Sequence, residues 1–463
     1  MDLDADGRSD ILFGDVEGRI LVLLQKERGV FVAQEPLIVT AGGMVQMLSP
    51  FPDKDGDGRL DYLYASVYTF PPNGFLLNPG FSTSVEFDEN KAQNALFRIE
   101  AGGGLTRVEL PGEVVECGDS PSMASQFATR HHLGLEDTLY ISAAWAPDCA
   151  FPISSSQGTP VEPIHMPGGF ASYTKLNWSM GVDHTYIDEG VLFAVSDIGV
   201  VLMGRPRVNL WVLGEEDTLV TLEGQEANML PDPPAKVGWG VHFADFDLDG
   251  HTDLLFAHGK PGIISDLDEQ GEPVLTWPIH YVKWGGVELF KGEEGGAMVE
   301  AVGAEPPEHS ERSSYGIMVG DFYGKDGRGD GCMDVVVTPV LLPRCVPGSA
   351  ECVREELIDI PMVFRNSAGI LRNRCADESE KAFVGVRSPT HDSGAVARLR
   401  LSSGKEIHRP IRAAAGIAGT SETSVVFALP NGESVEALEL IHPKGTTTPI
   451  EPSAAGYSGW LKP

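Results

Sequence analysis

Three segments of this chain carry the same nine-residue acidic pattern, and each is followed at once by a short apolar run. They span residues 2–10, 53–61 and 245–253, with Asp at positions one, three, five and nine and Gly at position six. The apolar runs, such as Leu254-Leu255-Phe256, have the composition of β-strands. A motif that recurs ahead of strands at several places in one chain indicates a repeat protein built from β-units.

The spacing of these carboxylates suits a hard cation. Ca²⁺ binds six to eight oxygen atoms at about 2.3–2.6 Å, supplied by carboxylates, carbonyls and water. Aspartates at positions one, three and five converge when the chain wraps around an ion, and Gly at position six permits the sharp turn. Position seven would contribute its carbonyl and position nine a closing carboxylate. An EF-hand closes with Glu at position twelve and lies between helices, so these loops are of another kind.

The sequence therefore predicts Ca²⁺ as the cofactor, bound in three loops. The alternative interpretation is that these Asp- and Gly-rich stretches are surface turns without metal. The predicted ligands are Asp2, Asp4, Asp6, Arg8 and Asp10 in the first loop, Asp53, Asp55, Asp57, Arg59 and Asp61 in the second, and Asp245, Asp247, Asp249, His251 and Asp253 in the third.

Residues 321–334 form a fourth, longer copy of the pattern. Counting back from Asp334 places Arg328 at position three, where an arginine cannot bind a cation. The tripeptide Arg-Gly-Asp at 328–330 is one that some integrins bind, but a role as metal ligand explains its aspartate better. An alignment that allows an insertion gives the predicted ligands as Asp321, Asp326, Asp330 and Asp334.

The charge balance disfavours several classes of partner. Lys and Arg number 34 against 67 Asp and Glu, which gives a formal net charge of -33. Such a surface disfavours nucleic acids and anionic membranes as partners, and no apolar run reaches the roughly 18–20 residues that span a bilayer. The first residues are acidic and unlike a signal peptide. An acidic composition is common in secreted proteins, so we expect an extracellular, periplasmic or cell-surface location.

Six cysteines without paired CxxC spacing favour disulfides over a zinc site. Cys345 and Cys352 enclose a Pro-Gly turn and are expected to close a small loop. The even number favours an oxidising compartment, and the alternative is six thiols in a cytosolic protein. From proximity along the chain, the other expected pairs are Cys117 with Cys149 and Cys332 with Cys375.

A second marker, small residues around a glycine, precedes the acidic loops. It occurs near Gly43, Gly238 and Gly316, and again near Gly134 and Gly181, where strands follow but the acidic residues are lost. Hairpins follow each unit, in a repeat of about 50–80 residues without helical periodicity. The sequence therefore predicts degenerate units near residues 131–141 and 180–193, and it leaves open whether these bind metal.

Repeats of four short strands are typical of a β-propeller, which protects its sheet edges by radial repetition. Six units carry part of the signature. Because the chain begins inside an acidic loop, the strand before that loop is missing, and we expect a seven-bladed propeller that is N-terminally truncated here. The predicted fold class is all-β, with the propeller at residues 1–380. From 381 to 463 the acidic loops stop and strands such as 396–401 alternate, which predicts a small antiparallel β domain.

The acidic loops, with a glycine before and a strand after, resemble FG-GAP/VCBS repeats, the units of integrin-α-like propellers. The tail resembles the ASPIC/UnbV domain of the cartilage acidic protein family. In place of that domain's Trp-Pro-Ser-Gly and Phe-Gly-Leu-Gly, this chain has residues 442–445 and 427–430. The resemblance implies extracellular or cell-surface calcium-binding proteins, often with adhesive or matrix roles, and it does not imply a reaction. The tail residues that match are Val384-Gly385-Val386, 394–399, Gly416, Ser421, 427–429 and 442–445.

No catalytic motif accompanies these features, since HExxH, GxSxG, a Walker loop and a dinucleotide-binding turn are all missing from the sequence. His131 and His132 would point to opposite faces of a strand, and we expect them to be ordinary histidines. The prediction is a non-enzymatic module that binds an extracellular protein or glycan. The alternatives are a hydrolase or lyase acting on polysaccharide, and a structural matrix component.

Overall fold

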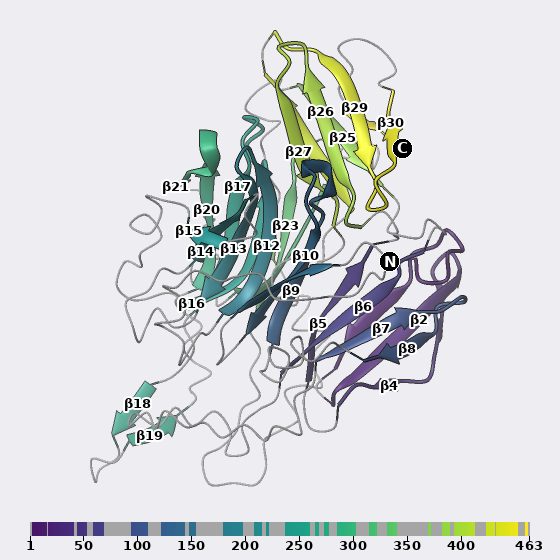
Figure 1. Cartoon of the computed structure of the whole chain (residues 1–463). Coiled ribbons are helices and arrows are strands. Elements are labelled where there is room, and N and C mark those ends of the chain that lie inside the picture. Colours follow the sequence, from purple (N-terminus) through teal and green to yellow (C-terminus); the bar gives the residue numbers. More distant parts are fainter. Residues whose placement is uncertain are drawn as a thin grey trace.

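The computed structural model of the chain has an almost entirely β architecture (Figure 1). Besides strands, the described residues contain two short 3-10 turns, η1 (His131–Leu133) and η2 (Glu294–Gly296). The all-β prediction is confirmed. Among the same residues, no helix has the length and apolar character needed to cross a membrane. The structure describes residues 2–15, 17–40, 44–52, 59–68, 94–109, 122–143, 148–153, 179–197, 208–214, 219–221, 237–259, 264–267, 273–276, 285–301, 314–321, 331–339, 369–371, 382–388, 393–412, 423–430, 432–451 and 459–461.

Six consecutive antiparallel sheets account for most described residues up to 371. Each is a meander of strands that follow one another along the chain. The sheets are β1 (Ile11–Gly14), β2 (Arg19–Glu27) and β3 (Val30–Ala33), with β4 (Leu37–Ile38) also on β2; β5 (Met44–Phe51), β6 (Tyr62–Tyr68), β7 (Ala95–Ile99) and β8 (Leu105–Val108); β9 (Ser122–Ala128), β10 (Asp137–Ala143) and β11 (Cys149–Ile153); β12 (Ser179–Ile187), β13 (Gly190–Asp197), β14 (Val208–Leu213) and β15 (Leu219–Thr221); β16 (Val237–Ala244), β17 (Asp253–Gly259), β20 (Gly285–Gly292) and β21 (Met298–Glu300); and β22 (Ser314–Gly320), β23 (Asp334–Pro339) and β24 (Gly369–Leu371). A separate hairpin, β18 (Ile264–Leu267) and β19 (Pro273–Thr276), lies between β17 and β20 in sequence.

Successive sheets pack face to face, as the blades of a propeller do. Their first strands are neighbours: β5 contacts β9, β9 contacts β12, β12 contacts β16 and β16 contacts β22. Because side chains alternate between the faces of a strand, one blade supplies two cores. In β13, Val191 and Phe193 enter the core shared with β10, whereas Leu192 enters the core shared with β17.

Buried serines connect neighbouring blades. Ser49 Oγ of β5 donates to the Ser125 carbonyl of β9 at 2.8 Å, and Ser142 Oγ of β10 donates to the Met180 carbonyl of β12 at 2.9 Å. A small hydroxyl lets two strands approach closely while the hydrogen bond satisfies a buried backbone carbonyl. Neighbouring blades are therefore joined by polar contacts as well as by apolar packing.

The C-terminal unit consists of two further sheets that face each other. A buried cluster that includes Val384, Leu399, Phe427 and Leu440 fills the space between them. Only the pairing of β25 with β31 is parallel among the described strands. The two sheets contain β28 (Ser424–Leu429), β25 (Ala382–Arg387) and β31 (Gly459–Leu461), and β27 (Glu406–Pro410), β26 (Val396–Leu401), β29 (Val435–Ile441) and β30 (Thr447–Pro449).

This C-terminal unit sits directly on the propeller, at the top of Figure 1. Phe383 and Val426 join a core with Leu255 of β17, and Val396 joins a core with Tyr186 of β12. The number of seven blades, the closure of the ring and the domain boundary at residue 380 stay predictions.

The two cysteines within the described residues are both oxidised. Cys149 in β11 and Cys332 just before β23 are disulfide-bonded. The expected pairings of these two, and the expected Cys345–Cys352 loop, involve cysteines outside the described residues and stay predictions.

Candidate metal centres

Two of the predicted loops, 2–10 before β1 and 245–253 before β17, have the same backbone conformation. Position four is left-handed in both, at Ala5 with φ 57° and Leu248 with φ 56°, and so is position six, at Gly7 with φ 82° and Gly250 with φ 97°. A residue with a Cβ pays roughly 1–2 kcal/mol to adopt this region. Such strain persists only where the surrounding contacts enforce it, and here the same contacts are present in two blades.

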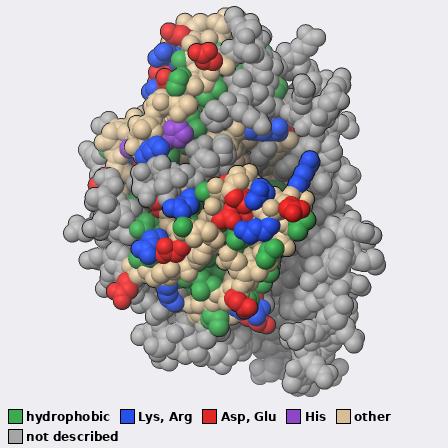
Figure 2. Space-filling view, turned by 90° about the vertical axis from the view of Figure 1, so that its right-hand side faces the viewer, with side chains coloured by type: hydrophobic (Ala, Val, Ile, Leu, Met, Phe, Trp, Pro, Cys, Tyr) green, Lys and Arg blue, Asp and Glu red, His purple; other side chains and the backbone are tan. Residues whose placement is uncertain are grey.

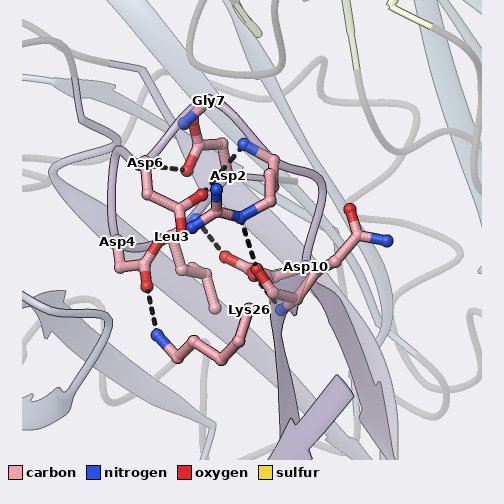
Figure 3. A network of polar contacts seen from close by, with 9 residues as sticks. Asp2, Leu3, Asp4, Asp6, Gly7, Asp10 and Lys26 are labelled. Carbon is pink, nitrogen blue, oxygen red and sulfur yellow. Dashed lines mark hydrogen bonds and ion pairs between the residues drawn. The ribbon is translucent and has the colours of Figure 1, made fainter. Parts of the chain in front are cut away.

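The carboxylate at position one organises each loop. In the first loop, Asp2 accepts the N–H groups of Asp6 at 3.1 Å and Gly7 at 2.9 Å (Figure 3). In the third loop, Asp245 accepts the N–H groups of Asp249 and Gly250, each at 3.1 Å. Both aspartates are buried. The position-one carboxylate therefore folds the chain back on itself, which brings the later aspartates toward it.

The carboxylate at position nine ties each loop to the neighbouring strand. Asp10 accepts the N–H of Leu3 at 2.7 Å and that of Gln25 in β2 at 2.9 Å. Asp253 does the same with Phe246 at 2.8 Å and Gly292 in β20 at 2.9 Å. The sequence predicts both as metal ligands. The structure shows that they also anchor the loops, a function that depends on partners far along the chain.

Each loop gathers three carboxylates. One oxygen from each of Asp2, Asp4 and Asp10 lies within 4.8 Å of the others, and Asp245, Asp247 and Asp249 meet the same condition. Positions one and three are common to both groups, while the third member differs.

The Asp4 side chain is only 7 % exposed, and its Oδ1 is buried without a hydrogen-bond partner. A buried carboxylate oxygen is unfavourable when it has neither a hydrogen bond nor a cation. The three carboxylates of this loop therefore fit Ca²⁺.

A lysine from the neighbouring strand reaches position three in both loops. Lys26 Nζ lies 2.8 Å from Asp4 Oδ2, and Lys291 Nζ of β20 forms an ion pair with Asp247 Oδ2. The hydrogen bond from Lys26 is the main cause that lowers the pKa of Asp4. These lysines could not be predicted from the sequence, because they lie 22 and 44 residues from their partners along the chain.

Burial affects the carboxylates of the third loop strongly. It raises the pKa of Asp245 to about 7, and the nearby Asp249 adds to the effect. Burial likewise raises the pKa of Asp253 to about 7, with Asp245 as a further cause. Acidic groups whose pKa is raised by burial and by one another favour a nearby cation, because positive charge stabilises their ionised forms.

The first loop differs at position five. Asp6 Oδ2 forms an ion pair with the Arg8 side chain, whose Nε donates to the Gln25 carbonyl at 2.8 Å. Asp6 therefore stands outside the group of three carboxylates in this loop, whereas its counterpart Asp249 belongs to the group in the third loop. At position seven the sequence predicts the backbone carbonyls of Arg8, Arg59 and His251 as ligands, and this stays a prediction.

The fourth loop keeps the same scheme around an insertion. Gly331 has φ 86° and donates its N–H to Asp321 Oδ2 at 2.8 Å, as the position-six glycine does to position one in the other loops. Asp334 follows three residues later, at position nine. Asp321 therefore takes the part that position one has in the other loops, and the ligand set of the fourth loop stays a prediction. Asp326 and Asp330 themselves lie outside the described residues, as do Asp53, Asp55 and Asp57 of the second loop, of which Arg59 and Asp61 are described.

The degenerate unit near residue 131 is the same loop without its ligands. Asp137 accepts the N–H of Arg130 at 2.6 Å, seven residues back, as position nine does elsewhere. Gly134 has φ 78° at position six. Positions one, three and five are Thr129, His131 and Leu133, which offer no carboxylate. The other degenerate unit has only the short turn between β12 and β13. Neither contains the acidic set.

The comparison with protein families agrees with the repeat. Residues 2–66 match the FG-GAP-like repeat family. No curated protein matches the chain. Among solved structures, BBS1N in complex with ARL6DN shares 10% identity at a TM-score of 0.38, covering 73% of this chain and 74% of that one. The Dos1 propeller shares 8% identity at 0.29, covering 60% and 54%. The GH43 endo-arabinanase from Bacillus licheniformis shares 11% at 0.27, covering 62% and 91%.

Proposed function

We propose that this chain is a calcium-binding propeller module of an extracellular or cell-surface protein, and that it binds a partner and catalyses no reaction. One observation carries the proposal: the first and fifth blades contain the same strained loop, with three carboxylates gathered in each. Surface turns that served only to reverse the chain would not need to share a left-handed non-glycine residue and a buried carboxylate cluster.

In this proposal the ions stabilise the structure. Asp2, Asp4 and Asp10 would hold one ion, and Asp245, Asp247 and Asp249 another. The remaining oxygens would come from backbone carbonyls and water. Calcium would offset the repulsion among the carboxylates and fix the connection between the first and second strands of a blade. Sites of extracellular modules have Kd values on the order of 10⁻⁴–10⁻³ M, and we expect values in that range.

We infer that the C-terminal unit is an ASPIC/UnbV-type domain that rests on one of these loops. Arg409 of β27 donates to the Gly250 carbonyl at 3.2 Å and to the Thr252 hydroxyl. A calcium ion in loop 245–253 would therefore also fix the surface on which the C-terminal unit sits. The partner would be an extracellular protein or glycan. The disulfides at Cys149 and Cys332 support an oxidising compartment.

Thermal unfolding in calcium and in excess chelator tests the proposal. At free calcium ten times Kd, each site contributes about 1.4 kcal/mol of stability, so the melting temperature should rise measurably in calcium. Asp247→Asn should reduce that rise while leaving the melting temperature in chelator almost unchanged. Asp137→Asn, at position nine of the loop without ligands, is the matched control: it should destabilise the protein equally in both media.

Two results would oppose the proposal. One is an equal melting temperature in calcium and in chelator for the wild type. The other is an equally large rise with magnesium, which demands a smaller octahedral site and gives up its water reluctantly; that result would indicate general charge screening.

A further inference from the structure

The C-terminal unit contacts the acidic loops and their degenerate counterpart in several blades. Arg387 of β25 donates to the Asp321 carbonyl at the start of the fourth loop, at 3.2 Å. The Gly394 carbonyl accepts a hydrogen bond from the hydroxyl of Thr129, at the start of the loop without ligands. Together with the contact to loop 245–253, these bonds place one face of the C-terminal unit over equivalent loops of three blades.

Loop 245–253 shares a core with the C-terminal unit. Phe246 at position two is 5% exposed and Leu248 at position four is 4% exposed. Both belong to a buried cluster that includes Phe383 and Val426 of the C-terminal unit. Leu248 is also the left-handed residue of this loop. The C-terminal unit therefore helps to bury the residue whose backbone is strained.

Loop 2–10 has the same backbone conformation in a different environment. Ala5, its left-handed residue at position four, is exposed. Leu3 at position two is fully buried, in a core formed by residues of the first two blades. Figure 2 shows the side of the molecule on which the first blade lies, where acidic and basic side chains lie together at the surface. One acidic loop is therefore covered by the C-terminal unit, and the other is held by its own blades.

Arg409 of β27 contacts loop 245–253 on both sides of position seven. Its guanidinium donates to the Gly250 carbonyl at position six, at 3.2 Å, and to the Thr252 hydroxyl at position eight. Between these two residues lies His251, whose carbonyl is a predicted ligand. A guanidinium presents its donors in one rigid plane, so Arg409 holds the chain in place on both sides of that carbonyl.

The charge of Arg409 is compatible with a cation in the loop. Burial lowers the pKa of Arg409, and the nearby carboxylates of Asp245, Asp253 and Asp249 oppose this effect. The aspartates at positions one, three, five and nine carry a negative charge that calcium, Lys291 and Arg409 would balance together. Substitution of Arg409 by lysine keeps the charge and removes the paired hydrogen bonds, so it isolates their contribution.

We propose that calcium binding to loop 245–253 and the seating of the C-terminal unit are thermodynamically coupled, whereas loop 2–10 binds calcium independently of that unit. The inference rests on the proposed function, since it requires that both loops bind calcium. The C-terminal unit holds Leu248 and the segment around His251 in the conformation in which the carboxylates converge. Because coupling between two binding events is reciprocal, calcium in this loop strengthens the seating of the C-terminal unit by the same factor.

Hydrogen exchange measured by mass spectrometry over a calcium titration tests the coupling, because it follows each loop separately in the whole chain. Arg409→Lys should raise the calcium concentration that half-protects loop 245–253 by about tenfold. It should leave the value for loop 2–10 unchanged. Arg398→Lys is the matched control, since Arg398 pairs with Glu439 inside the C-terminal unit, and it should change neither value. A loss at both loops, or at neither, would overturn the proposal.

The same measurement tests the reverse direction at residues 406–412, a segment that includes the buried Arg409 and Arg412. Calcium should slow their exchange by about tenfold in the wild type and in Asp4→Asn, and it should have little effect in Asp247→Asn. Residues 435–449, on the other side of the same sheet, serve as the internal control and should not respond.

The outcomes separate the coupling from the calcium sites themselves. A wild type in which calcium protects both loops but leaves residues 406–412 unchanged would overturn the coupling alone. An equal response of these residues in Asp247→Asn and Asp4→Asn would do the same. A wild type in which calcium protects neither loop would overturn the proposed function as well.

Discussion

At the scale of single residues, the two acidic loops show how much of a candidate metal site can be predicted from the spacing of residues along the chain. The positions of Asp2, Asp4 and Gly7 could be predicted from the sequence, because the ligands of such a loop are close along the chain. The lysines at position three could not, since Lys26 and Lys291 come from strands that meet the loops only in the fold. The ion pair of Arg8 with Asp6 is a local contact that the carboxylate pattern did not reveal.

The lysine at position three should weaken calcium binding. Lys291 holds a positive charge against Asp247, and a cation entering the loop must work against that charge. We expect Lys291→Met to raise the calcium affinity of loop 245–253 several-fold and to lower the melting temperature slightly in chelator. Isothermal titration calorimetry measures the affinity, with Lys405→Met as the control. An unchanged or lower affinity would show that the lysine does not compete with the ion.

In the first loop, the glycine at position six should be required for its conformation alone. Gly7 has φ 82°, and a Cβ added there would have no atom within 4 Å. Gly7→Ala should therefore cost about 1–2 kcal/mol through backbone strain. Gly104 has φ outside the left-handed region, and its added Cβ would meet only Glu100 Cβ, at 3.8 Å. Gly104→Ala should be nearly neutral in chemical denaturation, and a similar loss for both variants would contradict this account.

At the scale of elements, two arginines at the end of β27 fix the C-terminal unit to the propeller. Arg412 lies 2.8 Å from Asp183 Oδ2 and donates to the carbonyls of His184 at 2.7 Å and Phe243 at 2.6 Å. These partners belong to β12 and β16, so one side chain joins two blades and the C-terminal unit. Burial raises the pKa of Asp183 to about 6 even beside this guanidinium. No periodicity or motif in the sequence could have predicted this contact.

Loss of Arg412 should be costly because it leaves a buried carboxylate without its ion-pair partner. We expect Arg412→Met to destabilise the protein by about 3–5 kcal/mol. Asp183→Asn/Arg412→Met should lose clearly less than the sum of the two single variants, since they share one interaction. A double-mutant cycle by chemical denaturation measures this coupling. Additive losses would show that the two groups act independently.

A half-buried histidine between the propeller and the C-terminal unit should make stability depend on pH. His132 packs edge-on against Tyr186 at 4.8 Å and tilted against His408 of β27 at 5.1 Å, measured between ring centroids. Neither of its ring nitrogens has a hydrogen-bond partner. Burial lowers the pKa of His132 to about 3, and the neighbouring His408 and His131 act in the same direction while Asp137 opposes them.

The direction of this pH dependence follows from the protonation of His132 in the folded and unfolded states. Below the ordinary pKa of 6.5, the unfolded chain binds a proton at this residue that the folded protein does not bind, so stability is lost between about pH 6.5 and pH 3. His132→Phe keeps the aromatic packing and removes the proton. Its stability relative to the wild type should rise as pH falls through this window, by up to about 1.4 kcal/mol per pH unit. A difference that is constant with pH would contradict the assignment.

At the scale of the whole molecule, the sequence predicted the class of fold better than the arrangement of the C-terminal unit on the blades. The acidic loops of four blades and the hairpins after them predicted the meander sheets. The loop at 129–137 shows the same scaffold after the loss of its ligands, since Asp137 and Gly134 still hold the backbone. How the C-terminal unit sits on the blades depended on contacts such as Arg409 with loop 245–253, which join distant segments.

The central claim is that each intact acidic loop holds one structural calcium ion. The most direct test is to count bound calcium after equilibrium dialysis for the wild type, Asp4→Asn and Asp247→Asn. Asp188→Asn, an exposed aspartate in the blade without a loop, serves as the control. We predict that each position-three variant loses one ion relative to the wild type and that the control loses none. A wild type that retains no calcium, or variants that retain the full number, would contradict the claim.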